Sequence, residues 1–258
     1  MMSRLKHLFD QKSTRVLNVY CTAGFPQLNS TLEVMESLQA NGADIIELGM
    51  PYSDPLADGE VIQNSSLIAL GNGMTIDILF EQLATMRQKI HIPVVLMGYM
   101  NPILQYGFEA FCKKAKEVGV DGLILPDLPL YEFEAEYGMT IKDNGLDFIF
   151  LVTPETPEER LRKLDSLSTG FLYAVSSSAT TGTDKDFTKV ALYLEKLKSM
   201  NLNNPILVGF GIKDKESFDA VNVYTNGAII GSAYIQALSK GKDVESTTAQ
   251  FLNEVLGN

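Results

Sequence analysis

Short runs of apolar residues recur along the chain at intervals typical of strands that alternate with helices. The candidate strands are residues 17–23, 43–49, 93–99, 122–127, 147–153, 170–176, 205–211 and 227–233. Each run is almost continuously apolar, which is typical of parallel strands that are covered on both faces. The pattern therefore predicts a parallel sheet that lies between helices.

Between these runs, apolar residues recur every three or four positions, which is the period of a helix with one buried face. The segments with this period are 29–42, 75–89, 107–119, 156–168, 186–200, 213–225 and 233–256. In the first of them, Ser30 and Glu33 have the spacing of a capping box, which predicts that the helix begins at Ser30.

Eight strands that alternate with helices over 258 residues predict an α/β fold, a (β/α)8 or TIM barrel, with residues 1–258 in a single domain. The connection between the second and third strands, residues 50–92, is longer than one helix requires. We expect an additional helix at 59–73 and an N-terminal helix to supplement the barrel. Because active sites of such barrels lie at the carboxyl ends of the strands, the beginning of this insertion is a candidate functional region.

The predicted barrel directs attention to polar residues near the carboxyl ends of the strands. Glu47 is a carboxylate in the otherwise apolar run DIIELG, and burying it costs free energy unless it is paired or used. We therefore interpret Glu47 as a functional residue. The alternative is a carboxylate that a tyrosine or a backbone amide satisfies. Tyr20, Tyr99 and Tyr173 occupy similar places in their own strands.

Two strand ends late in the chain are rich in glycine. The runs VGFGIKD and IIGSAYI place Gly209, Gly211, Gly231 and Ser232 at the ends of the seventh and eighth strands. Backbone N–H groups at such ends bind phosphate, and phosphate sites in these barrels often follow strands seven and eight. The sequence thus favours a phosphate site over the alternative, tight packing of small residues at a strand–helix corner.

A polar loop follows the sixth predicted strand. Its sequence SSSATTGTDKD, residues 176–186, contains no apolar anchor, and its place over the predicted mouth of the barrel indicates a lid. The alternative is an ordinary surface connection.

Composition and charge narrow the possible partners. The net charge of −11 argues against a nucleic-acid surface, which needs clustered Lys and Arg, but backbone amides still allow a phosphorylated substrate. Cys21 and Cys112 form no disulfide framework and no metal motif, so we expect no metal. No apolar run has membrane-spanning length and no signal-peptide pattern occurs, so we expect a cytoplasmic protein.

The stretch ELGMPYSDPLADGEVIQ, residues 47–63, closely resembles the segment E-L-G-x-P-[FY]-S-D-P-x-A-D-G-P-x-I-Q of the tryptophan synthase α chain. The runs YCTAGFP, MGYMNPI, LPDLP, TGFLYAVS, VGFGI and IIGSA match further segments of that family in the same order. The resemblance implies a (β/α)8 fold and a carbon–carbon lyase of tryptophan biosynthesis. Such a lyase cleaves indole-3-glycerol phosphate to indole and glyceraldehyde 3-phosphate by a retro-aldol reaction.

The resemblance also implies a partner and a division of chemistry. A β chain would receive the indole within an α2β2 heterotetramer and would carry pyridoxal phosphate. We expect no cofactor in this chain.

The resemblance further implies roles for individual residues. Glu47 corresponds to the general acid and base, Asp58 to the carboxylate that binds the indole N–H, and Tyr173 to a tyrosine beside the reacting atoms. The other implied contacts are Tyr20, Met97, Tyr99 and Leu125 around the indole, Gly182, Gly209, Gly211, Gly231 and Ser232 at the phosphate, and Thr181, which would meet Asp58 when the lid closes.

The remaining acids of the stretch have simpler interpretations. Asp54 precedes a proline and is either a turn residue or part of the β-chain interface. Glu60 stands where the family usually has proline, and we expect a helix-start charge. Without the resemblance, Asp58 would be equally well explained as a helix N-cap. In the lid, Ala179 and Ser177 depart from the family pattern, which bears on loop closure and removes no catalytic group.

Three alternatives share part of this evidence. A stand-alone indole-forming lyase would have the same catalytic residues and work without a β chain. A non-catalytic activator of a β chain is disfavoured because Glu47, Asp58 and Tyr173 are all present. A phosphosugar isomerase would share the late glycines but would not need the acid-rich loop.

Overall fold

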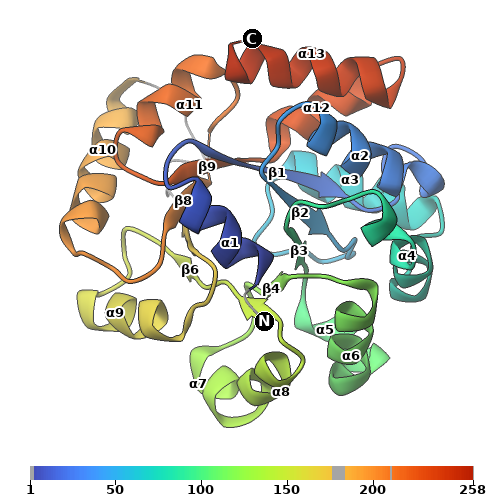
Figure 1. Cartoon of the computed structure of the whole chain (residues 1–258), viewed down its shortest axis with the longest axis horizontal. Coiled ribbons are helices and arrows are strands. Elements are labelled where there is room, and N and C mark those ends of the chain that lie inside the picture. The colour runs from blue at the N-terminus through green and yellow to red at the C-terminus, as the bar shows by residue number, and fades with distance from the viewer. Residues whose placement is uncertain (1–2, 176–183, 210, 258) are drawn as a thin grey trace.

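Parallel strands form the centre of the molecule and helices surround them (Figure 1). The computed structural model describes residues 3–175, 184–209 and 211–257. The strands are β1 (Val16–Thr22), β2 (Ile45–Gly49), β3 (Val94–Met97), β4 (Gly122–Ile124), β5 (Asp147–Phe148), β6 (Leu151–Val152), β7 (Leu172–Val175), β8 (Ile206–Gly209) and β9 (Gly227–Ile230).

Helices connect these strands along the chain. They are α1 (Arg4–Gln11), α2 (Thr31–Ala40), α3 (Glu60–Gly71), α4 (Ile76–Leu83), α5 (Met100–Tyr106), α6 (Phe108–Val118), α7 (Leu130–Glu132), α8 (Gly138–Asp143), α9 (Glu158–Leu167), α10 (Asp184–Ser199), α11 (Lys215–Asn222), α12 (Ser232–Lys240) and α13 (Val244–Leu256). Short 3-10 turns lie at η1 (Leu28–Ser30) and η2 (Met86–Gln88), and a π-helical segment lies at η3 (Phe133–Tyr137). Among the described residues, no helix is long and apolar enough to cross a membrane.

The sheet closes on itself, which confirms the predicted barrel. The strand order is β5-β4-β3-β2-β1-β9-β8-β7-β6, and neighbouring strands pair in parallel. The two end strands, β5 and β6, are separated along the chain only by Ile149 and Phe150. One predicted strand, 147–153, therefore supplies both ends of the sheet and is divided in the structure.

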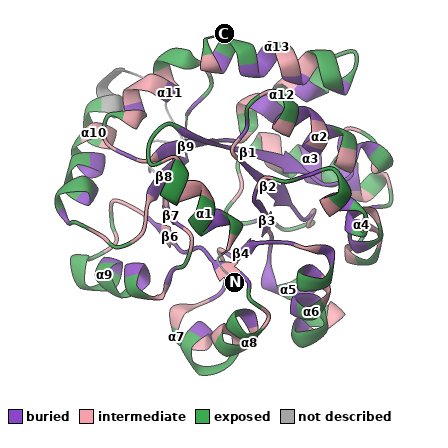
Figure 2. Ribbon diagram, viewed as in Figure 1, coloured by how far each residue is buried: buried purple, intermediate pink, exposed green. Residues whose placement is uncertain are grey.

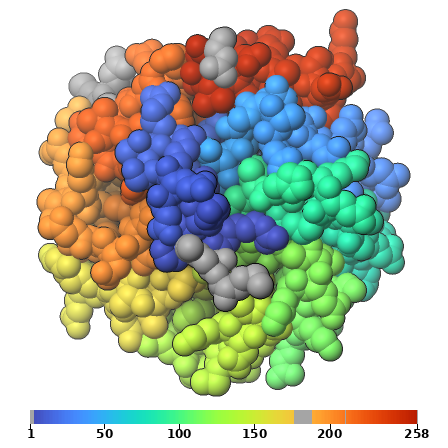
Figure 3. Space-filling view, viewed as in Figure 1, coloured from blue at the N-terminus to red at the C-terminus, as the bar shows by residue number. Residues whose placement is uncertain are grey.

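One end of the barrel is closed by apolar side chains and by α1. The interior cluster at this end consists of Leu5, Val16, Ile45, Val95, Ile124, Ile149, Phe171, Leu207 and Ile229. Leu5 is fully buried, and Leu8 and Phe9 pack against the same cluster. In Figures 1 and 3, α1 lies across the centre of this face.

A larger apolar cluster joins the strands to the surrounding helices. Figure 2 shows the strands buried, whereas the outer faces of the helices are exposed. Because α1 covers the amino-terminal ends of the strands, the carboxyl ends are the part of the barrel where loops and polar side chains can form a site.

The helices agree with the sequence predictions in place and differ in detail. The insertion forms α3, and α1 is the expected N-terminal helix. The predicted helix 233–256 is divided at Gly241, and Asp243 begins α13 by accepting a hydrogen bond from the Ser246 N–H at 2.8 Å. The predicted capping box at Ser30 is wrong, because Ser30 lies in η1 and its side chain makes no capping hydrogen bond.

Candidate active site

Glu47 is buried inside the barrel, near the carboxyl end of β2. Its Cα pairs with Tyr20 of β1 and Val95 of β3, so its strand is covered on both edges. Successive side chains of a strand point to opposite faces, which places Glu47 on the same face as Ile45, a member of the interior cluster. Glu47 is only 1% exposed, so its carboxyl group is removed from bulk water.

Burial changes the proton affinity of Glu47. It raises the pKa from 4.5 to about 8, and the negative charge of Asp58 acts in the same direction. A hydrogen bond from Asn18 Nδ2 to Glu47 Oε2, at 2.8 Å, has the opposite effect on the pKa. Most Glu47 side chains therefore hold a proton at pH 7, which suits a general acid.

Asp58 lies in the loop between β2 and α3. The N-cap of α3 is Gly59, and no side chain caps this helix, so Asp58 is not the helix cap that the sequence also allowed. Burial raises the pKa of Asp58 to about 6, and the Tyr99 hydroxyl has the opposite effect. At pH 7, Asp58 is therefore mostly ionised while Glu47 is mostly protonated. Two neighbouring carboxyls with separated pKa values are a common arrangement for acid and base roles.

Two tyrosines hold the Asp58 loop against the end of β3. The Tyr99 hydroxyl accepts a hydrogen bond from the Ala57 N–H at 3.0 Å. The ring of Tyr52, whose hydroxyl accepts a hydrogen bond from Asn101 at 3.1 Å, lies 5.4 Å from the ring of Tyr99. The loop that carries Asp58 is thus attached to the barrel at two points.

Two more tyrosines occupy the barrel interior beside Glu47. A Cβ atom at Gly49 would overlap the ring of Tyr20, and one at Gly209 would overlap the ring of Tyr173. Burial raises the pKa of both hydroxyls well above the ordinary value, and the charge of Glu47 adds to this effect. Both phenols therefore stay protonated near neutral pH, where they can donate hydrogen bonds but cannot act as bases.

The glycine-rich strand ends separate into two kinds of position. Gly209 lies within β8 and makes room for Tyr173, so its missing side chain has a packing reason. Gly211 has φ +66° and open space around it, and Gly231 is the N-cap of α12, without a side-chain cap. Ser232, the first residue of α12, is exposed. The first-turn N–H groups of α12 thus follow directly from the end of β9.

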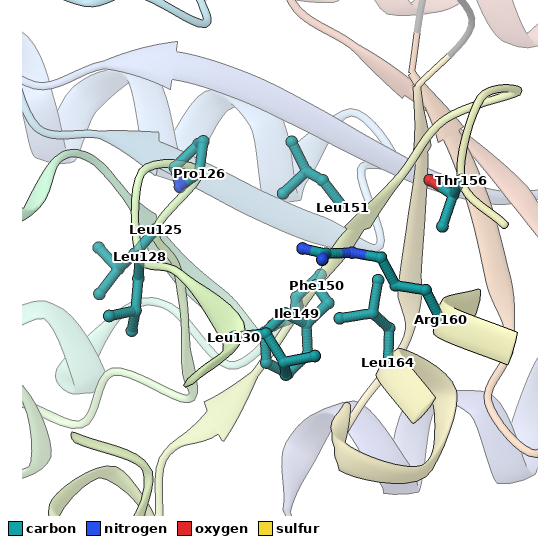
Figure 4. A pocket seen from close by; sticks show the side chains of 10 residues that line it. All are labelled: Leu125, Pro126, Leu128, Leu130, Ile149, Phe150, Leu151, Thr156, Arg160 and Leu164. Atoms are coloured by element: carbon teal, nitrogen blue, oxygen red, sulfur yellow. The ribbon is translucent and has the colours of Figure 1, made fainter. Parts of the chain in front are cut away.

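Leu125 directly follows β4 and is buried. It lines a cavity of about 170 Å³ with Leu128, Leu130, Phe150 and Arg160, among others (Figure 4). Its contact with the indole stays a prediction.

The structure also identifies a residue that the sequence analysis did not indicate. Asn18 is fully buried in β1 and contacts Glu47 directly. The available signal was the alternation of polar residues in NVYCT, where Asn18, Tyr20 and Thr22 share one face of the strand. Thr181 and Gly182, as well as Ser177 and Ala179, lie outside the described residues.

The part of the chain that the structure describes contains no cluster of metal-ligating side chains. No group of His, Cys, Asp and Glu side chains there is arranged to hold a metal ion. Cys21 and Cys112 are buried as free thiols. The candidate chemistry among the described residues therefore rests on the acid–base groups Glu47, Asp58 and Tyr173.

Comparisons with a family model, with curated proteins and with solved structures all point to the same family. Residues 7–257 match the family model described as tryptophan synthase alpha chain. A tryptophan synthase alpha chain from Flavobacterium johnsoniae is 51% identical over 89% of this chain and 91% of its own length. The crystal structure of tryptophan synthase subunit alpha from Legionella pneumophila is 33% identical, with a TM-score of 0.88 over 99% of this chain and 97% of its own. A chain of the tryptophan synthase complex from Pyrococcus furiosus is 34% identical, with a TM-score of 0.85 over 96% of this chain and 100% of its own.

Proposed function

The chain belongs to the tryptophan synthase alpha chain family, and we propose that Glu47, Asp58 and Tyr173 carry its cleavage of indole-3-glycerol phosphate. This reaction is a retro-aldol cleavage that releases indole and glyceraldehyde 3-phosphate. Indole C3 must gain a proton, and the hydroxyl next to the breaking bond must lose one. The observation that carries the proposal is a pair of neighbouring carboxyls, Glu47 buried and Asp58 half-buried, whose pKa values of about 8 and about 6 differ.

Glu47 can perform both proton transfers. Its protonated carboxyl donates to C3, and the ring takes up positive charge. The electrons of the C–C bond then flow into the ring while the resulting carboxylate accepts the proton of the substrate hydroxyl, which becomes the aldehyde. Glu47 is protonated again at the end of the cycle, so one carboxyl with a pKa near 8 supplies both the acid and the base.

Asp58 and Tyr173 stabilise the charge that this step creates. An ionised Asp58 accepts a hydrogen bond from the indole N–H, which becomes more acidic as the ring gains positive charge. Tyr173 stays a neutral phenol because burial raises its pKa, so its role is to orient the substrate or to donate a hydrogen bond. Tyr20, Met97, Tyr99 and Leu125 are proposed to surround the indole, in support of which Tyr20 pairs with Glu47 in the sheet and Tyr99 holds the Asp58 loop.

The phosphate group fits the late strand ends. Gly211 has open space where a side chain would stand, Gly231 is the N-cap of α12 without a side-chain cap, and Ser232 adds a hydroxyl at the first turn of α12, where the helix dipole favours an anion. Thr181 and Gly182 remain sequence predictions for the lid and the phosphate site.

A β chain is the partner of this chain, and we propose an α2β2 heterotetramer in which the β chain carries pyridoxal phosphate. Large exposed apolar side chains support a docking face at the carboxyl ends of β2, β3 and β4: Leu56 is 94% exposed, Leu104 48% and Tyr131 70%. Asp54 is exposed in the same loop as Leu56 and accepts a hydrogen bond from Ser53 Oγ at 2.6 Å. We further propose a single domain over the whole chain and a cytoplasmic location.

Conservative substitutions test the two carboxyls. Glu47→Gln and Asp58→Asn keep the side-chain shape and remove the charge and the proton. We expect each to lower kcat for indole release by about 10²- to 10⁴-fold while binding to a purified β chain is retained. Near-normal indole release by either variant would show that the assigned role of that residue is wrong.

A second measurement separates the synthase subunit from a stand-alone lyase. Indole release by the purified chain is compared with and without an added β chain. Strong activation by the β chain is expected of the synthase subunit. Full activity of the isolated chain, with no further increase, would favour the stand-alone enzyme.

A further inference from the structure

Asn18 is a polar side chain in a place where the barrel would otherwise accept an apolar one. It is 0% exposed, and in β1 it lies between the apolar residues Leu17 and Val19. Its amide makes one hydrogen bond through Nδ2, to Glu47 Oε2 at 2.8 Å. Its other polar atom, Oδ1, is buried and has no hydrogen-bond partner among the described residues.

This arrangement is unfavourable for stability. A buried amide oxygen without a partner loses its hydrogen bonds to water and gains none in the folded protein. A leucine has a similar volume and would avoid this loss. The stability of the barrel therefore does not explain Asn18, whereas its contact with Glu47 can.

The position of Asn18 restricts which oxygen of Glu47 it can hold. Asn18 pairs with Ile45, and Tyr20 pairs with Glu47, so Asn18 lies one interior position closer to the amino-terminal end of the barrel. It contacts Oε2 from the side away from the strand ends. Oε1 accepts no hydrogen bond from any residue that the structure describes, so none of those residues competes with a substrate for this oxygen.

We propose that Asn18 is a positioning residue that holds the Glu47 carboxyl in both of its protonation states. Nδ2 donates to the carboxylate, as in the structure. When Glu47 is protonated, its proton lies on Oε1, the oxygen left to the substrate, and Nδ2 still donates to Oε2, which is then the carbonyl oxygen of the acid. The asparagine amide is a neutral donor that does not titrate, so it holds Oε2 in place while Glu47 acts first as an acid and then as a base. This inference rests on the proposed catalytic role of Glu47.

The titratable groups around Glu47 do not obscure the influence of Asn18 on the Glu47 pKa. The titratable neighbours that influence it are Asp58 in the loop, Tyr20 and Cys21 in β1, and Tyr173 in β7. Burial raises the pKa of both tyrosines and of the thiol, so these three stay neutral over the pH range in question. Asp58 is the remaining charged neighbour, and a change at Asn18 leaves it in place.

The test is a titration of Glu47 in the Asn18→Leu variant. Protein labelled with ¹³C at the glutamate carboxyl carbons is titrated by NMR, and the Glu47 signal is assigned by its loss in Glu47→Gln. A hydrogen bond donated to a carboxylate is stronger than one donated to a neutral carboxylic acid, so losing the Nδ2 donor should raise the Glu47 pKa by about one unit. The alkaline limb of kcat/KM for indole release should move to higher pH by the same amount.

A matched control comes from a second asparagine. Asn222 in α11 also has a buried Oδ1 without a described partner, and its Nδ2 donates to the Phe218 carbonyl at 2.6 Å. Asn222→Leu removes the same chemical group away from Glu47, so it should leave both the Glu47 pKa and the pH profile unchanged.

The outcomes separate this inference from the proposed function. An upward shift in Asn18→Leu, with unchanged or higher thermal stability and no shift in Asn222→Leu, supports the positioning role. A folded Asn18→Leu with an unshifted Glu47 pKa overturns it, even if Glu47→Gln is inactive. If Glu47→Gln is active, the proposed function fails independently. If Asn18→Leu does not fold, the same titration is carried out on Asn18→Ala, with the same upward shift of the Glu47 pKa expected.

Discussion

Two carboxylates are buried at opposite ends of the barrel, and their surroundings differ. Asp121, just before β4 at the end closed by α1, is 6% exposed and accepts hydrogen bonds from Arg4 at 2.9 Å, Arg87 at 2.5 Å and the Val94 N–H at 2.7 Å. Glu47, near the other end, is 1% exposed and accepts one hydrogen bond from the residues that the structure describes, from the neutral amide of Asn18.

The difference separates a structural carboxylate from a chemical one. Arg87 also donates to the carbonyls of Gly119, Ile90 and Ile92, so the positive partner of Asp121 is itself held in place. Two arginines and a backbone amide compensate the charge of Asp121. Glu47 has no cationic partner among the described residues, and burial makes its charged form unfavourable. One barrel thus uses the same functional group to join elements at one end and to hold a proton at the other.

The largest expected effect concerns Asp121→Asn. This change leaves the guanidinium of Arg87 half-buried without its negative partner, which should lower the free energy of unfolding by about 3–5 kcal/mol. Urea denaturation measures the loss, and kcat for indole release should stay within about twofold because Asp121 lies far from the strand ends. A variant with unchanged stability would contradict the structural role of Asp121.

The pH dependence of kcat/KM tests the other side of the comparison. Activity needs an ionised Asp58 and a protonated Glu47, so it should rise through a pKa of about 6 and fall through a pKa of about 8. Below the lower pKa and above the higher one, kcat/KM should change by about tenfold per pH unit, because one proton is lost or gained on each limb. The two values belong to a coupled pair, and Asp58→Asn should remove the acid limb. A profile that is flat between pH 7 and 10 would rule out Glu47 as the acid.

The smallest effect is expected for Arg4→Ala. The side chain of Arg4 is 46% exposed, and Arg87 and Val94 still hold Asp121 after its removal, so the loss of stability should not exceed about 1 kcal/mol. Urea denaturation of Arg4→Ala and of Asp121→Asn, measured side by side, shows how much of the stabilisation of the Asp121 charge comes from Arg4 and how much from Arg87 and the Val94 N–H. If Arg4→Ala costs as much as Asp121→Asn, the exposed arginine is more important than its surroundings indicate.

The sequence alone predicted those features of the fold and the site that follow from a single physical rule. Alternating apolar runs predicted the parallel barrel, and the cost of burying a carboxylate was enough to single out Glu47. Asp58 could not be separated from a helix cap in this way, because the same residue type serves both purposes. Its distinction from a cap needed the observed N-cap at Gly59.

The remaining differences come from information that a single strand or helix does not contain. The division of the fifth strand at Ile149 and Phe150 follows from closing the sheet, which is a property of all strands together. The packing of Tyr173 against Gly209 joins two strands, so neither residue alone indicates it. The alternation of polar residues within β1 could have drawn attention to Asn18.

The central claim is that folded Glu47 holds a proton at neutral pH. The most direct test measures the free energy of unfolding from pH 5 to pH 9 for the protein and for its Glu47→Gln variant. The folded-state pKa of Glu47 is raised from 4.5 to about 8, so between these values the folded protein keeps a proton that the unfolded chain has lost. Stability from this group is therefore complete below pH 4.5 and is lost as the pH rises through 8. Relative to the Gln variant, the protein should lose on the order of 4 kcal/mol over this range. Two parallel stability curves would contradict the claim that Glu47 is buried as an uncompensated, proton-holding carboxyl.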